Sequence, residues 1–206
     1  MPLRFDCYYS LSSPWAYFAG PRLQDIARRH HATVTLKPYD FQKVVPVTGG
    51  VPLRTRPQPR QDYHAVELDR WRQYLGMPLN LKPRFYPPTD NIAPGHTVIA
   101  AEQAGEDAML LSHAILRALW SEERDISDPD IRRAICNECG LNGDRLINAE
   151  TTDAVTSAYK TYTDEAVTHG IFGAPTYRFN GTLFWGQDRL DFLDRALAVA
   201  APAATG

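Results

Sequence analysis

The chain has 206 residues, of which 44% are hydrophobic and 22% charged, and its formal net charge is −2. This length and composition are typical of a folded domain with a large core, and they exclude disordered and fibrous proteins. The small net charge excludes a strongly basic surface for nucleic acid or an anionic membrane. We therefore expect small molecules or proteins as partners, with no nucleic acid and no membrane.

The cellular location follows from three further features. No apolar run approaches the roughly 20 residues that span a bilayer. The first residues lack the basic and then apolar layout of a signal peptide. Cys7, Cys136 and Cys139 form a sparse, odd-numbered set, unlike a secreted disulfide framework. Together these features predict a cytoplasmic protein with reduced thiols.

The first predicted unit is a strand, a helix and a second strand. Residues 3–9 alternate with period two, and residues 14–30 carry apolar side chains at three- and four-residue steps. Ser13 and Pro14 suit the cap and the first position of that helix. Residues 33–37 alternate again, and Pro38 ends the run. A right-handed crossover would place these two strands in parallel.

The segment 41–59 reads as a loop, because it is rich in proline and glycine. Three arginines, Arg54, Arg56 and Arg60, lie in it or just after it. Their guanidinium groups could receive a carboxylate, although a solvated linker is equally compatible with the pattern.

Residues 59–168 read as an inserted all-α domain. Asp128 and Pro129 suit the start of a helix, while Gly140 and Gly143 lie where helix ends are expected. The predicted helices are 61–75, 91–104, 108–121, 128–138 and 151–168.

The last part of the chain returns to strands. Asn180-Gly181 joins the runs 175–179 and 182–185, which is a strong signal for a tight antiparallel hairpin. A closing helix is expected over 187–199, and residues 201–206 are expected to fray.

These elements assemble into an α/β, thioredoxin-like fold of the order βαβ…ββα, with an all-helical insertion between the halves. The predicted thioredoxin-like domain comprises 1–58 and 169–206, and the insertion comprises 59–168. In this plan Ser13 faces Ala174 and Pro175 across the start of the first helix. A proline that opens a strand here suggests a cis peptide bond.

Three segments in this order, SSPWAYFAG, GIFGAPTYRF and FWGQDRLDFL, resemble the 2-hydroxychromene-2-carboxylate isomerases. These are relatives of the kappa-class glutathione transferases and of the DsbA-like thioredoxin fold. The resemblance implies a homodimer with glutathione as cofactor and a small aromatic substrate. It also implies interconversion of 2-hydroxychromene-2-carboxylate and trans-o-hydroxybenzylidenepyruvate in aromatic catabolism.

The resemblance also assigns roles to individual residues. Ser13 corresponds to the active-site serine, and Ala174 with Pro175 to the backbone clamp for glutathione. Thr55 occupies the place of an asparagine that the family usually has in this loop, and Lys43 matches a basic position near the substrate carboxylate. Arg54 and Trp15 are further candidates for substrate binding. The glutathione-binding turn corresponds to Trp185, Gly186, Gln187 and Asp188.

The residues themselves restrict the chemistry of this turn. Disulfide exchange would need two cysteines three residues apart, and Ser13 and Ala16 stand there. The thiol must therefore come from outside the chain. A thiolate at the start of the helix would be stabilised by the helix dipole, the backbone donors and the Ser13 hydroxyl. It could add reversibly to a conjugated carbon and be expelled after bond rotation.

Other readings remain open. The protein could be a transferase that releases a glutathione conjugate, or a non-catalytic glutathione-binding protein. Trp15, Tyr17 and Phe41 could line an aryl pocket, although burial in the core is favoured for each. For the pair Cys136 and Cys139 a structural role is favoured over a metal or redox role, and no metal site is expected. Structural roles are likewise favoured for two lone histidines, His113 and His169.

Overall fold

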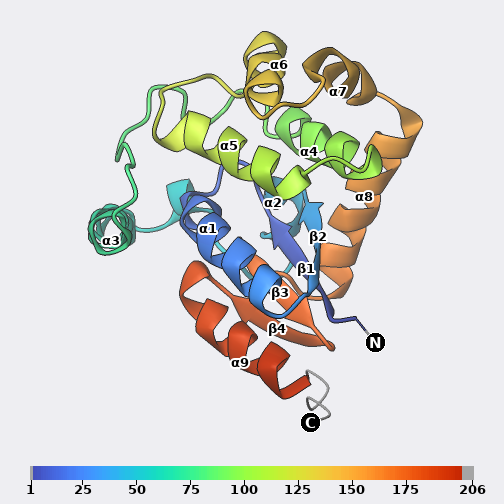
Figure 1. The fold of residues 1–206 in the computed structure, drawn as a ribbon. Coiled ribbons are helices and arrows are strands. Elements are labelled where there is room, and N and C mark those ends of the chain that lie inside the picture. Colours follow the sequence, from blue (N-terminus) through green and yellow to red (C-terminus); the bar gives the residue numbers. More distant parts are fainter. Residues whose placement is uncertain (1, 201–206) are drawn as a thin grey trace.

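A computed structural model describes residues 2–200 (Figure 1). Its sheet has four strands in the order β2-β1-β3-β4. Strands β1 and β2 are parallel, whereas β1 with β3 and β3 with β4 are antiparallel. The strands are β1 Arg4–Tyr9, β2 Thr33–Pro38, β3 Thr176–Phe179 and β4 Thr182–Trp185. This is the α/β thioredoxin-like order that the sequence predicts.

Each predicted helix is present, together with two short helices that the sequence did not predict. The first half of the fold contains α1 Pro14–Arg29, α2 Phe41–Val44 and the 3₁₀ segment η1 Leu53–Thr55. The helical insertion contains α3 Gln58–Leu75, α4 Ala93–Gln103, α5 Ala108–Trp120, α6 Pro129–Glu138, α7 Gly143–Ala149 and α8 Asp153–Thr168. The chain closes with the 3₁₀ segment η2 Gln187–Arg189 and α9 Leu190–Ala200.

The two faces of the sheet carry different cores, because successive side chains of a strand point to opposite faces. Cys7, Leu36 and Tyr177 share one buried cluster with α1, α5 and α9. Tyr8 points to the other face, where it joins a smaller cluster with Ala166 of α8. The sheet therefore lies between α1 and α9 on one side and α8 on the other (Figure 1).

The hairpin and the end of α6 follow local rules that the sequence shows. Asn180 and Gly181 have φ angles of 49° and 82°, as the predicted two-residue turn requires. Gly140, with φ 77°, follows the end of α6 in the left-handed conformation that favours glycine there.

Two local predictions were wrong. The segment 41–59 is not only a loop, because it forms α2 and η1, and α3 begins at Gln58 rather than at residue 61. The Asp40 side chain caps α2 by accepting the Lys43 N–H at 3.1 Å. Residue 143 begins α7 instead of ending a helix, since the Asn142 side chain caps that helix. A Cβ atom at Gly143 would lie 2.5 Å from a backbone oxygen of α6, so close packing explains the glycine.

Helix α8 belongs to the predicted insertion in sequence, but it packs on the sheet. Its Glu165 accepts hydrogen bonds from Lys37 at 2.7 Å and from the Tyr8 hydroxyl at 3.2 Å. His169, which caps the end of α8, lies 3.0 Å from the same hydroxyl through its Nδ1. This contact gives His169 the structural role that the sequence favoured. The domain boundaries at 58/59 and 168/169 stay a prediction.

Candidate functional site

The turn between β1 and α1 holds Ser13 at the cap of the helix. Its Oγ accepts the Ala16 N–H at 3.2 Å, and Pro14 occupies the first helical position, where a donor is not needed. The Trp15 N–H has no hydrogen-bond acceptor among residues 2–200. The start of α1 therefore presents one free backbone donor and the positive end of the helix dipole beside the Ser13 hydroxyl.

The segment before β3 meets this turn. The Ala174–Pro175 peptide bond is cis, as the sequence predicts. The Ser13 hydroxyl donates to the Ala174 carbonyl at 3.2 Å, which joins the two halves of the fold at this point. The Ala174 N–H has no acceptor within the described part of the chain. Ser13, Ala174 and Pro175 thus come together as expected.

The turn after β4 is hydrogen-bonded to the segment that carries Ala174 and Pro175. The Gly186 N–H donates to the Pro175 carbonyl at 2.9 Å. The Trp185 side chain is 50% exposed, and its ring centre lies 4.9 Å from that of Phe172 in an edge-to-face arrangement. The indole also covers Gly173, where an added Cβ atom would lie 2.2 Å from Trp185 Nε1. An accessible aromatic side chain therefore borders the Ala174–Pro175 segment.

The other two residues of this turn differ in exposure. Gln187 is buried, and its backbone carbonyl and side-chain oxygen accept hydrogen bonds from Arg22 at 3.1 and 2.9 Å. Asp188 is exposed and pairs with the neighbouring Arg189 at 2.7 Å. The hydrogen bonds of Gln187 therefore hold η2 against α1, whereas the Asp188 side chain is accessible to a ligand.

The other predicted site residues, Lys43, Arg54 and Thr55, lie in segments that flank the Ser13 turn. Lys43 is exposed and lies 3.9 Å from Asp164 of α8, and the Thr55 hydroxyl donates to the Pro52 carbonyl at 2.9 Å. Neither side chain contacts the Ser13 turn through a hydrogen bond or an ion pair in the described residues. Arg54 is exposed as well. The structure therefore places these three residues in the flanking segments without joining them to Ser13.

One aromatic contact beside the turn was not foreseen from the sequence. The half-buried Trp15 ring meets His64 of α3 edge-to-face, with 5.3 Å between ring centres. Burial, with a smaller contribution from the Arg56 charge, lowers the pKa of His64 to about 4. His64 is therefore neutral at physiological pH. No local pattern in the sequence signals this contact, because it depends on how α3 docks.

A second unforeseen aromatic contact lies within the helical insertion, at Tyr86. Its ring lies 4.8 Å from that of Trp120, between centres. Burial raises the pKa of Tyr86, and the nearby positive charge of Arg54 opposes that shift.

The cysteines of the chain are not suited to act as the thiolate. Cys7 is buried in β1, and burial raises the pKa of its thiol. Burial also raises the pKa of Cys136 to about 12 and the pKa of Cys139 above its usual value. All three are therefore thiols near neutral pH, and none lies at the Ser13 turn.

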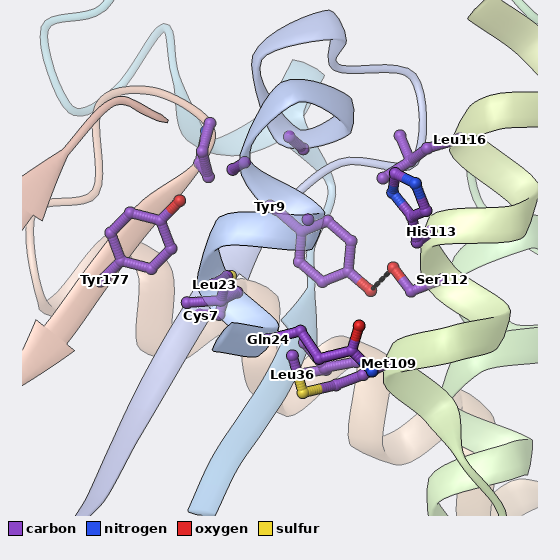
Figure 2. A pocket seen from close by; sticks show the side chains of 14 residues that line it. Cys7, Tyr9, Leu23, Gln24, Leu36, Met109, Ser112, His113, Leu116 and Tyr177 are labelled. Carbon is purple, nitrogen blue, oxygen red and sulfur yellow. Dashed lines mark hydrogen bonds between the residues drawn. The ribbon is translucent and has the colours of Figure 1, made fainter. Parts of the chain in front are cut away.

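A cavity of about 40 Å³ lies beneath α1, between the sheet and α5. Figure 2 shows Tyr177 entering it from β3 and His113 from α5. His113 stacks on Tyr17 with 5.4 Å between ring centres, which is the structural role favoured for it. The Tyr9 hydroxyl is bonded to Ser112 at 2.8 Å, whereas the Tyr177 hydroxyl has no partner in the described residues. This cavity belongs to the core beneath the site.

Comparison with known proteins identifies the family. Residues 4–198 match the model of the DSBA-like thioredoxin domain. The chain belongs to the DSBA-like thioredoxin domain family. It is 28% identical to the 2-hydroxychromene-2-carboxylate isomerase of Sphingobium xenophagum, over 96% of this chain and 99% of that protein. It is 25% identical to the enzyme of the same name from Pseudomonas putida, over 93% of each. This near full-length likeness to enzymes supports an isomerase function.

Two solved structures illustrate the shared fold. A 2-hydroxychromene-2-carboxylate isomerase structure aligns with a TM-score of 0.78 at 24% identity, covering 96% of both chains. The cytosolic disulfide reductase DsbM from Pseudomonas aeruginosa, solved with GSH, aligns with a TM-score of 0.68 at 20% identity, over 95% of this chain and 100% of that one.

Within residues 2–200 no helix is long and apolar enough to cross a membrane. The same residues contain no group of three or more side chains suited to hold a metal ion.

Proposed function

We propose that this protein is a glutathione-dependent isomerase that interconverts 2-hydroxychromene-2-carboxylate and trans-o-hydroxybenzylidenepyruvate, or a related aromatic compound. The observation that carries the proposal is Ser13 at the cap of α1, facing Ala174 and cis Pro175 with no cysteine at the turn. A site that binds a thiolate but has no cysteine of its own must take the thiol from a cofactor. The named relatives support the choice of reaction.

The residues present fit glutathione. The free Trp15 N–H and the α1 dipole would stabilise a sulfur anion, and the Ser13 hydroxyl can turn from Ala174 to donate to it. The free Ala174 N–H would hold the backbone of the cysteinyl part. Asp188 is accessible to an ammonium group, and Trp185 would cover the peptide. Gly186 supports this arrangement through its bond to Pro175.

When bound, glutathione supplies a thiolate that adds reversibly to a conjugated carbon, so that a double bond becomes a rotatable single bond until elimination restores it. Ser13 lowers the pKa of the thiol by donating a hydrogen bond without competing as a nucleophile. Trp15 offers an aryl surface beside Ser13. Arg54, Thr55 and Lys43 lie in the flanking segments and would contact the polar ends of the substrate or cofactor.

We include a homodimer and a cytoplasmic location in the proposal. The apolar side chains of Tyr63, Val66 and Tyr74 are exposed along α3, and this surface is available to a second copy. The relative DsbM is named as a cytosolic protein. Size-exclusion chromatography with light scattering would measure the oligomeric state.

The decisive experiment mixes the purified protein with 2-hydroxychromene-2-carboxylate, with and without glutathione, and follows substrate absorbance together with free thiol. Isomerisation that needs glutathione and leaves its amount unchanged is the expected result. Consumption of thiol in step with substrate would indicate a transferase. Saturable glutathione binding without turnover would indicate a binding protein or another substrate, and absence of binding would refute the proposal.

A further inference from the structure

The segment 170–175, between α8 and β3, is fixed by hydrogen bonds to its carbonyl groups. Three of these carbonyl oxygens accept from side-chain hydroxyl groups. The three bonds run from Thr48 to Ile171 at 2.7 Å, from Thr176 to Gly173 at 2.7 Å and from Ser13 to Ala174 at 3.2 Å. Thr48 is the donor that has no assigned role, and it comes from the turn after α2.

The turn that carries Thr48 is itself firmly folded. The Thr48 N–H donates to the Val44 carbonyl at 3.2 Å, and the Gly50 N–H donates to the Val45 carbonyl at 2.9 Å. Both valines are buried. The backbone of this turn is therefore anchored in the core, so the position of the Thr48 hydroxyl is set by the fold.

The distances indicate which acceptor the Thr48 hydroxyl uses. Its Oγ1 lies 2.7 Å from the Ile171 carbonyl oxygen, compared with 3.0 Å for Val44 and 3.4 Å for Val45. A hydroxyl has one proton to donate, and O–H···O bonds are usually about 2.7–2.8 Å long. Ile171 is buried, and its carbonyl has no other donor in the described residues. Without Thr48 this carbonyl would be unpaired.

A second contact joins the same two segments. An added Cβ atom at Gly50 would overlap the carbonyl oxygen of Phe172, so the turn packs directly against the backbone there. Val44, Ile171 and Ala174 also belong to one buried cluster. The turn after α2 therefore supports consecutive residues of the segment 170–175, and a shift at Ile171 would reach Ala174 three residues later.

The bond from Thr48 gains importance when glutathione binds. In the proposed function the Ser13 hydroxyl turns from the Ala174 carbonyl to the thiolate, and its single proton cannot serve both. Thr48 and Thr176 then remain as the side-chain donors to the segment. Thr176 belongs to β3 and moves with it, whereas Thr48 connects the segment to the first half of the fold.

We propose that Thr48 is a positioning residue that holds residues 171–174 in the conformation that binds glutathione. Thr48 acts through the Ile171 carbonyl and presents the Ala174 N–H to the cysteinyl part of the ligand. This role rests on the proposed function for the identity of the ligand. Because it concerns binding and not the addition step, the KM for glutathione should depend on the Thr48 hydroxyl, while kcat should not.

The test compares Thr48→Val, which keeps the shape but removes the hydroxyl, with Thr48→Ser, which keeps the hydroxyl. Isothermal titration of the full chain with reduced glutathione gives the affinity, and amide hydrogen exchange followed by NMR gives the local stability. Thr48→Val should weaken binding about fivefold and speed exchange of the Ile171 N–H by a similar factor, since one hydrogen bond to a buried carbonyl is lost. Thr48→Ser should stay within about twofold of the original protein in both measurements. At saturating glutathione, kcat should be the same in all three proteins.

Thr156→Val is the matched control. Thr156 also donates to a backbone carbonyl, that of Thr152 at 3.1 Å, but it lies near the start of α8, at the far end of that helix from the segment 170–175. It should change neither glutathione affinity nor exchange at Ile171. The N–H of Ile115, in the middle of α5, should exchange at the same rate in every variant.

The outcomes separate this role from the proposed function. Unchanged glutathione affinity in Thr48→Val, or an equal loss in Thr48→Ser, would overturn the role of Thr48 alone. Exchange that speeds as much at Ile115 as at Ile171 would also overturn it, because the whole fold would then be loosened. Absence of glutathione binding to the original protein would instead refute the proposed function. Binding without isomerisation would refute the reaction, and the affinities of the variants would still decide the role of Thr48.

Discussion

The Ser13 hydroxyl donates a hydrogen bond of 3.2 Å to the carbonyl of Ala174, which lies 161 residues away in the sequence. The same oxygen accepts the Ala16 N–H and so caps α1. Ser13 therefore has a structural role and a position at the candidate site at once. The two roles can be separated, because a cap requires only an acceptor, whereas stabilisation of a thiolate requires a donor.

Replacing Ser13 should separate stability from activity. Ser13→Ala removes both the acceptor and the donor, so we expect a loss of about 1 kcal/mol in the free energy of unfolding. We also expect kcat/KM to fall by about 10²-fold or more, since a hydrogen bond to a charged group is lost. Denaturant unfolding and the glutathione-dependent assay measure these two effects.

Two further variants act as controls for Ser13→Ala. Ser13→Thr keeps donor and acceptor and should retain most of the activity. Ser13→Asp is a good helix cap, but its negative charge would repel a thiolate, so stability should stay within about 0.5 kcal/mol while activity is lost. Full activity in Ser13→Asp would contradict a thiolate site at this turn.

A second prediction concerns Gly173 and Trp185. An added Cβ atom at position 173 would lie 2.2 Å from the indole nitrogen of Trp185. Because this indole is half exposed, it can swing away at little cost to the fold. Gly173→Ala should therefore raise the KM for glutathione several-fold while changing the free energy of unfolding by less than about 1 kcal/mol.

The variant Trp185→Ala tests whether Gly173→Ala raises the KM for glutathione by displacing the indole. If Gly173→Ala acts by displacing the indole, it should add little to the KM increase already caused by Trp185→Ala. Additive effects in the double variant would show that Gly173 acts independently of Trp185. Steady-state kinetics with varied glutathione measures the comparison.

The sequence is a good guide wherever structure depends on neighbours in the chain. Alternation predicts β1, and Asn180-Gly181 predicts the hairpin, because these signals are local. Short α2 and α7 were missed because each depends chiefly on one capping side chain, Asp40 or Asn142, and not on a repeated apolar pattern.

In the candidate site, too, some contacts could be predicted from the sequence and others could not. Ser13 and Pro175 could be brought together from the strand order alone, since both lie at known ends of neighbouring strands. The contact between Trp15 and His64 could not, because it depends on the angle at which α3 meets α1. Tertiary packing sets that angle, and no short sequence pattern encodes it.

The third prediction uses the pH dependence of stability at His64. The folded pKa is about 4, below the ordinary value of 6.5, so the unfolded chain binds the proton first as the pH falls. The contribution of neutral His64 is complete above pH 6.5 and is lost progressively down to pH 4. The loss amounts to roughly 3 kcal/mol at most.

His64→Gln should remove this part of the pH dependence. Free energies of unfolding at several values between pH 7 and pH 4 would be measured in both proteins. His31→Asn serves as the control, because His31 is exposed and its φ of 48° suits asparagine. Parallel stability curves for the original protein and His64→Gln would show that His64 is not buried as described.

The fourth prediction concerns a buried ion pair in the helical insertion. Arg132 donates to both carboxylate oxygens of Glu150 at 2.8 Å and to the Ile126 carbonyl at 2.8 Å. Their side chains are only 3% and 8% exposed. Arg132→Met would leave Glu150 buried without its partner and should cost about 3–5 kcal/mol.

The double variant Arg132→Met/Glu150→Leu removes both charges. It should recover much of the lost stability, because the unpaired carboxylate is gone. Denaturant titration of the two single variants and the double variant gives the coupling free energy. A double variant as unstable as the sum of the single variants would mean that the pair is not coupled.

The last prediction compares two tyrosines that line the cavity beneath α1. Tyr9 is hydrogen-bonded to Ser112, as Figure 2 shows, whereas the Tyr177 hydroxyl has no protein partner in the described residues. Tyr9→Phe leaves the buried Ser112 hydroxyl unpaired and should cost about 1–2 kcal/mol. Tyr177→Phe removes an unpaired buried hydroxyl and should be neutral or stabilising by up to about 1 kcal/mol. Thermal and denaturant unfolding of both variants provide the comparison. Because the cavity of about 40 Å³ has room for water, an equal loss in Tyr177→Phe would show that a bound water satisfies Tyr177.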